Sequence, residues 1–304
     1  MSSYLECNAR ERIQQLFDPN SLDEFLPPSA RVISPHLGQL NAPVAFDDGV
    51  VVGKALLHGE TVFIAAQEGG FMGGAVGEVH GAKLVGMLRR AVIEKPRAVV
   101  LLLETGGVRL HEANAGLIAV SEVMRAVLDT RAAGIPVIVL IGGSNGCFGG
   151  MGIVARCANW IVMSEEARLA MSGPEVIETA NGVEEFDSRD RALVWRTTGG
   201  KHRYMIGDCQ AIVTDSVGAF RSAAIEAIQA IQNSGADHSD QIALSLEALE
   251  HEQELLRKRI NSFGTLRDPL EIWRALGMND PANVPMLEIS DFISKAQHHR
   301  LGAA

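Results

Sequence analysis

Short apolar segments that alternate with longer helical segments are the feature that most constrains the fold of this chain. Residues 61–66 (TVFIAA), 98–103 (AVVLLL), 135–141 (IPVIVLI), 160–163 (WIVM) and 211–214 (AIVT) are typical of strands. Strands that are apolar throughout are buried on both faces of a sheet, and strands that alternate with helices form mainly parallel sheets with right-handed crossovers. The pattern therefore predicts an α/β fold whose sheet is covered on both faces.

Helices are predicted where apolar residues recur every three or four positions. Residues 9–17 form a first helix, which Pro19 ends. Three later helices have apolar stripes that we expect to face the core. The stripes consist of Leu117, Val120, Met124 and Leu128, of Val217, Phe220, Ala224, Ile228 and Ile231, and of Ile242, Leu246, Leu249, Leu256 and Ile260.

The last 64 residues differ in character from the α/β part. A polar break, GADHSD, lies at 235–240, and no strand pattern follows it. We therefore assign residues 1–240, including the N-terminal helical segment, to one domain, and residues 241–304 to a helical C-terminal extension of the same domain.

Charge and composition exclude several classes of function. The net charge of −10 argues against nucleic acid as a partner, because nucleic-acid binding relies on a basic surface. There is no apolar stretch of membrane-spanning length and no signal-peptide pattern, so we expect a cytoplasmic protein with no membrane contact. Four scattered cysteines form no C-x-x-C pair, so we expect neither a disulfide framework nor a bound metal.

Three glycine-rich segments lie near strand ends: FMGGAVGEVHG (71–81), ETGGVRLHE (104–112) and IGGSNGCFGGMG (141–152). Glycine lets the backbone approach a ligand closely, and ligands of open α/β sheets bind beyond the carboxyl ends of the strands. None of the segments fits the G-x-G-x-x-G fingerprint or a P-loop, which argues against nucleotide phosphates.

Ser144 lies within G-x-S-x-G, the pattern of a hydrolase nucleophile. A nucleophilic serine should begin a helix directly, whereas two further glycines, Gly149 and Gly150, precede any helical pattern here. We therefore favour a loop role for the Ser144 hydroxyl.

The remaining hypothesis uses the backbone alone. The turns Gly106-Gly107-Val108 and Gly149-Gly150 can each present an amide N–H to one oxygen, and two such amides form an oxyanion hole. The simple alternative is that both are tight turns without a ligand.

Five ordered segments resemble a known family. ARERIQQLFDP, FMGGAVGEVHGAK, TGGVRLHE, GGSNGCFGGMG and LAMSGPEVIE follow the order and spacing found in carboxyltransferase subunits of acyl-CoA carboxylases, within the crotonase-like superfamily. The stretches FDDGVVVGKALLHGETVFIAAQEGGFMGG and FDSRDRALVWRTTGGKHRY most resemble the beta subunits of malonate decarboxylases. The resemblance spans roughly residues 9–220 and implies the ββα spiral of the crotonase-like fold.

The resemblance also implies an activity and its partners. Such a subunit pairs with a homologous gamma subunit, and the pair decarboxylates a malonyl thioester on an acyl carrier protein; an acyl-carrier-protein transferase belongs to the same complex. The carrier arm is a CoA-like phosphoribosyl-dephospho-CoA group, and no biotin is expected. Two alternatives stay open: a carboxyltransferase that passes the carboxyl group to or from biotin, and a non-catalytic scaffold for the gamma subunit.

Site residues follow from these motifs. The resemblance places the catalytic amides at Gly107, Val108, Gly149 and Gly150. We add substrate-binding positions at Gly106, Gly73 and Gly74 and two candidate proton donors, His111 and Glu112, for which a structural role is the alternative. Glu104, at a strand end, is expected to anchor its turn through backbone amides. Six cations could hold an arm phosphate, with a solvated helix face as the favoured alternative: Arg156, Arg189, Arg191, Arg196, Lys201 and Arg203.

Overall fold

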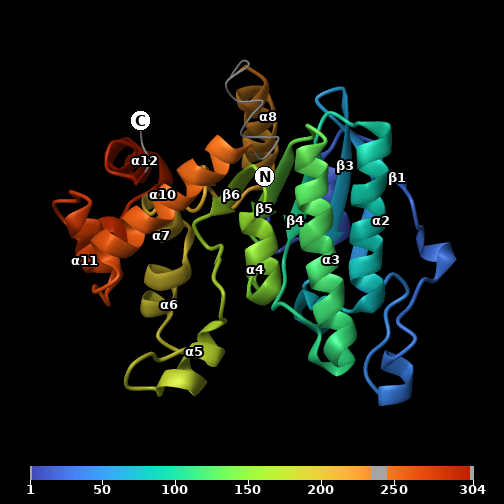
Figure 1. Cartoon of the computed structure of the whole chain (residues 1–304), viewed down its shortest axis with the longest axis horizontal. Coiled ribbons are helices and arrows are strands. Elements are labelled where there is room, and N and C mark those ends of the chain that lie inside the picture. Colours follow the sequence, from blue (N-terminus) through green and yellow to red (C-terminus); the bar gives the residue numbers. More distant parts are fainter. Residues whose placement is uncertain (1, 234–244, 302–304) are drawn as a thin grey trace.

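A single seven-stranded sheet organises the protein, and its strands follow one another in chain order. The computed structural model describes residues 2–233 and 245–301 (Figure 1). The strands are β1 (Asp23–Glu24), β2 (Val50–Leu57), β3 (Glu60–Gln67), β4 (Val99–Leu103), β5 (Val137–Ile141), β6 (Trp160–Ser164) and β7 (Ala211–Val213). Pairing is antiparallel from β1 to β3 and parallel from β3 to β7. The five predicted strands are confirmed, with ends that differ by at most two residues.

Strand β2 was not predicted. Gly53 and Lys54 interrupt its apolar run, and it pairs with β3 as a hairpin in which Leu57 faces Glu60. The two loop residues, His58 and Gly59, both have positive φ, which matches the twist of a two-residue hairpin turn.

Helices cover both faces of the sheet. The α-helices are α1 (Ala9–Leu16), α2 (Glu78–Glu94), α3 (Ala113–Ala132), α4 (Gly149–Arg156), α5 (Pro174–Asn181), α6 (Arg191–Thr198), α7 (Gly200–Met205), α8 (Val217–Asn233), α10 (Leu246–Phe263), α11 (Pro269–Ala275) and α12 (Ile289–Ala296). Short 3-10 helices are η1 (Pro28–Ala30), η2 (Leu37–Leu40), η3 (Met72–Gly74), η4 (Leu110–Glu112) and η5 (Pro281–Met286). Figure 1 shows α2 and α3 side by side against the strands.

The two cores follow from alternation along the strands. In β4, Leu101 and Leu103 pack with α2 and α3, whereas Val100 and Leu102 pack with α1 and α8. Alternate residues of a strand point to opposite faces, so an entirely apolar strand fills both cores. No helix in the described ranges is long and apolar enough to cross a membrane.

The predicted helix stripes differ in outcome. The stripe of α8 is confirmed, since Val217, Phe220, Ala224 and Ile228 are buried. The stripe of α3 is rotated from the prediction: Leu117 is 57% exposed, whereas Val123 and Val127 are buried. Gly81 of α2 and Ala119 of α3 let the two helices approach closely, because a Cβ at Gly81 would lie 2.6 Å from the Ala119 Cβ.

The third predicted helix is present as α10, but its apolar stripe does not face the core. Its apolar residues are exposed, from 42% at Leu256 to 70% at Ile260, and α10 has no buried residue. Arg259 ties the helix to the body through an ion pair with Asp208 at 2.5 Å. Periodicity shows which residues share a face but does not show whether another element covers that face. Ile242 lies outside the described residues.

The rest of the C-terminal part packs firmly on the α/β body. Trp273, Val284 and Phe292 belong to the same core as the central strands. Residues 245–301 contain helices and no strand. The predicted boundary between 240 and 241 falls outside the described residues, so the division remains a prediction.

Candidate active site

Two glycine turns meet at one edge of the sheet. The first, Gly106–Val108, follows β4, and the second, Gly149–Gly150, follows β5 and begins α4. Because β4 and β5 are parallel neighbours, their carboxyl ends lie together. The backbones touch: a Cβ at Gly107 would lie 3.3 Å from the Gly149 Cα, and one at Gly149 would lie 3.1 Å from the Gly107 Cα. Both residues also have positive φ, so glycine is required at each.

Thr105 joins the two turns. Its N–H donates to the Gly146 carbonyl at 2.8 Å, and its carbonyl accepts from the Phe148 N–H at 3.0 Å. Its hydroxyl oxygen accepts from the Gly107 N–H at 3.0 Å. The sequence analysis missed this fully buried residue, and its only signal was its place between Glu104 and the glycine pair.

The four predicted catalytic amides divide into two kinds. The Gly107 N–H is bonded to Thr105, and the Gly149 N–H donates to the Met171 carbonyl at 2.9 Å. Within residues 2–233 and 245–301, the Val108 and Gly150 N–H groups have no acceptor. Gly150 lies in the first turn of α4, and the N-cap residue Phe148 provides no side-chain cap. Val108 and Gly150 are therefore the amides available to a ligand oxygen.

Backbone pairing sets the direction of the Val108 amide. The Val76 N–H donates to the Gly107 carbonyl at 2.8 Å, and the Arg109 N–H donates to the Val76 carbonyl at 2.9 Å. Successive amides of an extended chain point to opposite sides, so the Val108 N–H points away from Val76. The Val108 nitrogen lies 4.0 Å from the position of a Cβ at Gly149, so it borders the second turn.

The predicted substrate-binding glycines lie beside the first turn. The Gly106 N–H donates to the Gly73 carbonyl at 2.9 Å. A Cβ at Gly74 would lie 1.8 Å from the Glu104 carbonyl oxygen, so Gly74 permits η3 to pack against the end of β4. Gly106 itself is exposed.

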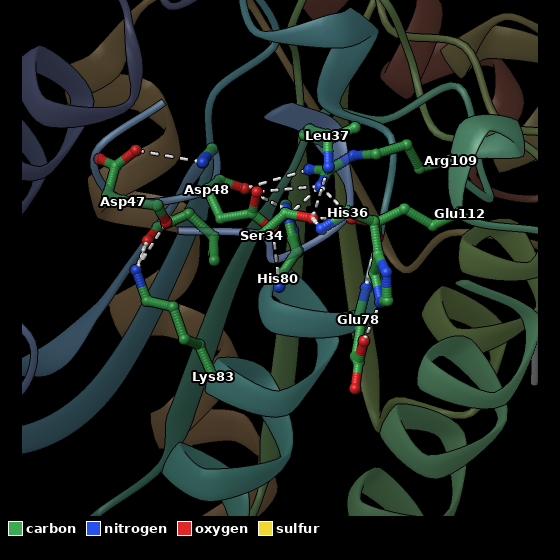
Figure 2. A network of polar contacts seen from close by, with 12 residues as sticks. Ser34, His36, Leu37, Asp47, Asp48, Glu78, His80, Lys83, Arg109 and Glu112 are labelled. Atoms are coloured by element: carbon green, nitrogen blue, oxygen red, sulfur yellow. Dashed lines mark hydrogen bonds and ion pairs between the residues drawn. The ribbon is translucent and has the colours of Figure 1, made fainter. Parts of the chain in front are cut away.

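The two candidate proton donors lie in different surroundings. Glu112 is buried: its carboxylate accepts from the Glu78 N–H at 2.6 Å and from the Ser34 hydroxyl, and it lies 3.6 Å from Arg109 (Figure 2). These contacts cap the N-terminus of α2 and fit the structural alternative for Glu112. His111 is exposed on η4.

Glu104 was expected to anchor its own turn, but its carboxylate anchors the second loop instead. Its carboxylate accepts from the Asn145 N–H at 3.2 Å and from the Ser144 hydroxyl at 3.2 Å, and it pairs with Arg12 at 2.5 Å. The Ser144 hydroxyl is thus bonded to a buried carboxylate rather than to an imidazole. This arrangement supports a loop role for Ser144 and not a nucleophilic one.

Several of the predicted phosphate-binding cations line a separate cavity of about 380 Å³. Its walls include Arg191, Arg196 and Lys201 together with the indoles of Trp195 and Trp273. Lys201 is already engaged, with Glu165 at 2.5 Å and the Leu287 carbonyl at 2.6 Å. Arg203 and Arg156 pair with Asp208 at 2.8 and 3.4 Å. No group of three or more metal-ligating side chains occurs among the described residues.

Comparison with known proteins identifies the family. Residues 6–231 match the carboxyl transferase domain. The chain belongs to the carboxyl transferase domain family. It is 39% identical to the malonyl-S-ACP:biotin-protein carboxyltransferase MADC of Malonomonas rubra, over 97% of this chain and 96% of that protein.

Solved structures agree with this assignment. The chain is similar to a Pseudomonas malonate decarboxylase hetero-tetramer solved in complex with malonate, with 41% identity, a TM-score of 0.73 and coverage of 76% of this chain and 84% of that one. It is also similar to the Pseudomonas malonate decarboxylase MdcD-MdcE hetero-dimer, with 37% identity, a TM-score of 0.61 and coverage of 75% and 88%. The predicted crotonase-like carboxyltransferase fold and the resemblance to malonate decarboxylase subunits are confirmed.

Proposed function

We propose that this chain is a subunit of a malonate decarboxylase that converts a malonyl thioester on an acyl carrier protein to an acetyl thioester and CO2. The relatives described above support this reaction class. The observation that carries the proposal is the pair of facing glycine turns, which leave the Val108 and Gly150 amides available at one edge of the sheet.

The chemistry requires little beyond those amides. The bond between Cα and the free carboxylate breaks, CO2 leaves, and the electron pair forms an enolate whose negative charge lies on the thioester oxygen. Two N–H donors directed at that oxygen stabilise it, each by about 3 kcal/mol in the transition state. The N-terminus of α4 adds the positive end of its helix dipole.

A proton must then reach Cα to complete the acetyl thioester. The contacts of Glu112 keep its carboxylate occupied within the protein. His111, exposed on η4 three residues after Val108, is the candidate donor from this chain, and water or a partner residue is the alternative.

A homologous gamma subunit is the partner that fits the surface around the turns. Leu110 lies on η4 and is 85% exposed, and Ile118 lies on α3 and is 63% exposed. Met171, whose carbonyl accepts from the Gly149 N–H, is 64% exposed. Large apolar residues grouped near a site mark a protein interface. The carrier protein, with its phosphoribosyl-dephospho-CoA arm, and the carrier transferase complete the proposed cytoplasmic complex.

Carboxyl transfer to biotin is the second candidate function, because the Malonomonas rubra relative is a malonyl-S-ACP:biotin-protein carboxyltransferase. Both reactions pass through the same enolate, so the glycine turns serve either. The scaffold alternative differs, since it assigns no role to the turns.

The test is to assemble the chain with its gamma subunit and follow CO2 release from malonyl carrier protein without biotin. We expect turnover that avidin does not inhibit. Release that requires a biotin protein, or that avidin abolishes, would support the second candidate instead. The chain without its partner serves as the control for background decarboxylation.

A further inference from the structure

A continuous series of buried polar groups runs behind the two glycine turns. At the end of β4, the Glu104 backbone N–H donates to Gln67 Oε1 at 3.2 Å, and the Glu104 carboxylate accepts from the Asn145 N–H before the second turn. Gln67 Nε2 lies 3.1 Å from His80 Nε2, and His80 Nδ1 lies 3.1 Å from the Asp48 carbonyl. Gln67, Asp48 and His80 are at most 1% exposed.

The series ends at the first turn. Arg109 directly follows Val108, and its Nη1 donates to both carboxylate oxygens of Asp48, at 2.9 and 3.0 Å. Asp48 Oδ2 also accepts from the His80 N–H at 2.9 Å (Figure 2). Arg109 and Asp48 are fully buried, so solvent does not compete for these contacts.

Donors and acceptors agree along the whole series. The Glu104 N–H must donate, so Gln67 presents its carbonyl oxygen to it and its amide nitrogen to His80. His80 then accepts at Nε2 and donates from Nδ1 to the Asp48 carbonyl. Burial, followed by the nearby Arg109 charge, lowers the pKa of His80 to about 3, which keeps the ring neutral as this pattern requires.

Strained backbone lies next to the same groups. Asp48 has φ of 53° and Ala113, which follows Glu112, has φ of 46°, values that non-glycine residues rarely adopt. Such residues persist where the surroundings hold them and are frequent at functional sites. A buried polar series is also costly compared with apolar packing, so its contribution is to geometry more than to stability.

We propose that Gln67 and His80 are positioning residues that couple the two glycine turns and hold the Val108 and Gly150 amides in a fixed relative arrangement. Neither side chain touches the substrate. Gln67 holds the Glu104 backbone, whose carboxylate anchors the loop before Gly149. His80 acts through Asp48 and Arg109, which hold the chain after Val108. The inference rests on the proposed function, because it assigns those amides to one oxygen.

The variants that test this are His80→Gln and Gln67→Met. His80→Gln changes the hydrogen-bonding geometry, and Gln67→Met removes the link while nearly preserving side-chain length. His202→Gln is the matched control, since His202 is another buried histidine whose pKa burial lowers to about 3. It lies on α7, and its Nδ1 accepts from the Trp273 indole N–H at 3.2 Å. All chains are assayed in the assembled complex after thermal unfolding shows them folded.

We expect kcat to fall roughly tenfold or more in both variants while KM changes less than twofold, because only the transition-state oxyanion needs both amides aligned. The double variant should lose little more than the worse single one, since one break already interrupts the series. His202→Gln should lose stability but keep kcat. A purely structural role would make all three variants alike in kcat.

Two outcomes overturn the inference: wild-type kcat in folded Gln67→Met, or additive losses in the double variant. If His80→Gln does not fold, Gln67→Met alone decides.

Failure of the proposed function is detected separately, by assaying the wild-type complex for CO2 release. If that complex carboxylates biotin instead of releasing CO2, the same variants are assayed by biotin carboxylation, which uses the same enolate.

Discussion

At the residue scale, substitutions of Gly150 can distinguish the effect of losing its backbone N–H from the effect of crowding its neighbours. Proline at this position removes the N–H, and its ring is tolerated in the first turn of a helix. We expect Gly150→Pro to lower kcat about 100-fold in the assembled complex, the usual cost of losing one oxyanion-hole donor. Turnover is measured under saturating malonyl carrier protein.

Gly150→Ala is the control for this change. Both substitutions add a Cβ that would lie 2.6 Å from Val120 Cγ1, but alanine keeps the N–H. The alanine variant should therefore show only the smaller loss that comes from crowding. Equal losses in the two variants would mean that packing, not the amide, explains the effect.

Individual residues of the site also differ in whether the sequence could predict their roles. The glycine turns were predictable because each follows a strand end, whereas the loop that the Glu104 carboxylate anchors was not. Gln67, His80 and Asp48 were not, because they lie on β3, on α2 and in the loop before β2. Their contacts join residues 13 to 37 positions apart, and no local pattern records such pairings.

At the element scale, α10 is a helix whose apolar face lacks a covering element in the described chain. Leu246 and Ile260 are 67% and 70% exposed. We expect Leu246→Ala and Ile260→Ala to change the free energy of unfolding of the isolated chain by less than about 0.5 kcal/mol, since exposed substitutions seldom do more. Urea unfolding measures the change.

Leu88→Ala on α2 is the comparison. Leu88 is fully buried against the sheet, so its truncation should cost about 2–5 kcal/mol. A loss of similar size at Ile260 would show that α10 packs on the body in solution. The contrast explains why apolar periodicity predicted both helices but predicted the buried face of α8 correctly and that of α10 incorrectly. The two stripes are equivalent in sequence, and only the tertiary structure distinguishes them.

At the scale of the whole molecule, the sheet order explains why so much of the architecture was predictable. Neighbours in sequence are neighbours in the sheet from β1 to β7, so local patterns and short crossovers specify most of the topology. The exceptions are the C-terminal helices, where Trp273 and Phe292 join a core that includes Ile212 of β7 and all the central strands before it. Contacts between segments so far apart in the chain depend on the folded surface and not on a repeat in the sequence.

Two buried histidines make the stability of the whole chain depend on pH. Burial lowers the pKa of both His80 and His202 to about 3 from the ordinary value of 6.5. Below pH 6.5 the unfolded chain binds protons that the folded chain does not, so stability is complete above pH 6.5 and falls as the pH decreases toward 3. For each of these histidines, the free energy of unfolding should fall by about 1.2 kcal/mol between pH 7.0 and 5.5. Urea unfolding at the two pH values measures the sum, and His202→Gln should reduce the pH-dependent part to about half. An unfolding free energy that stays constant over this interval would contradict the neutral, buried state of both rings.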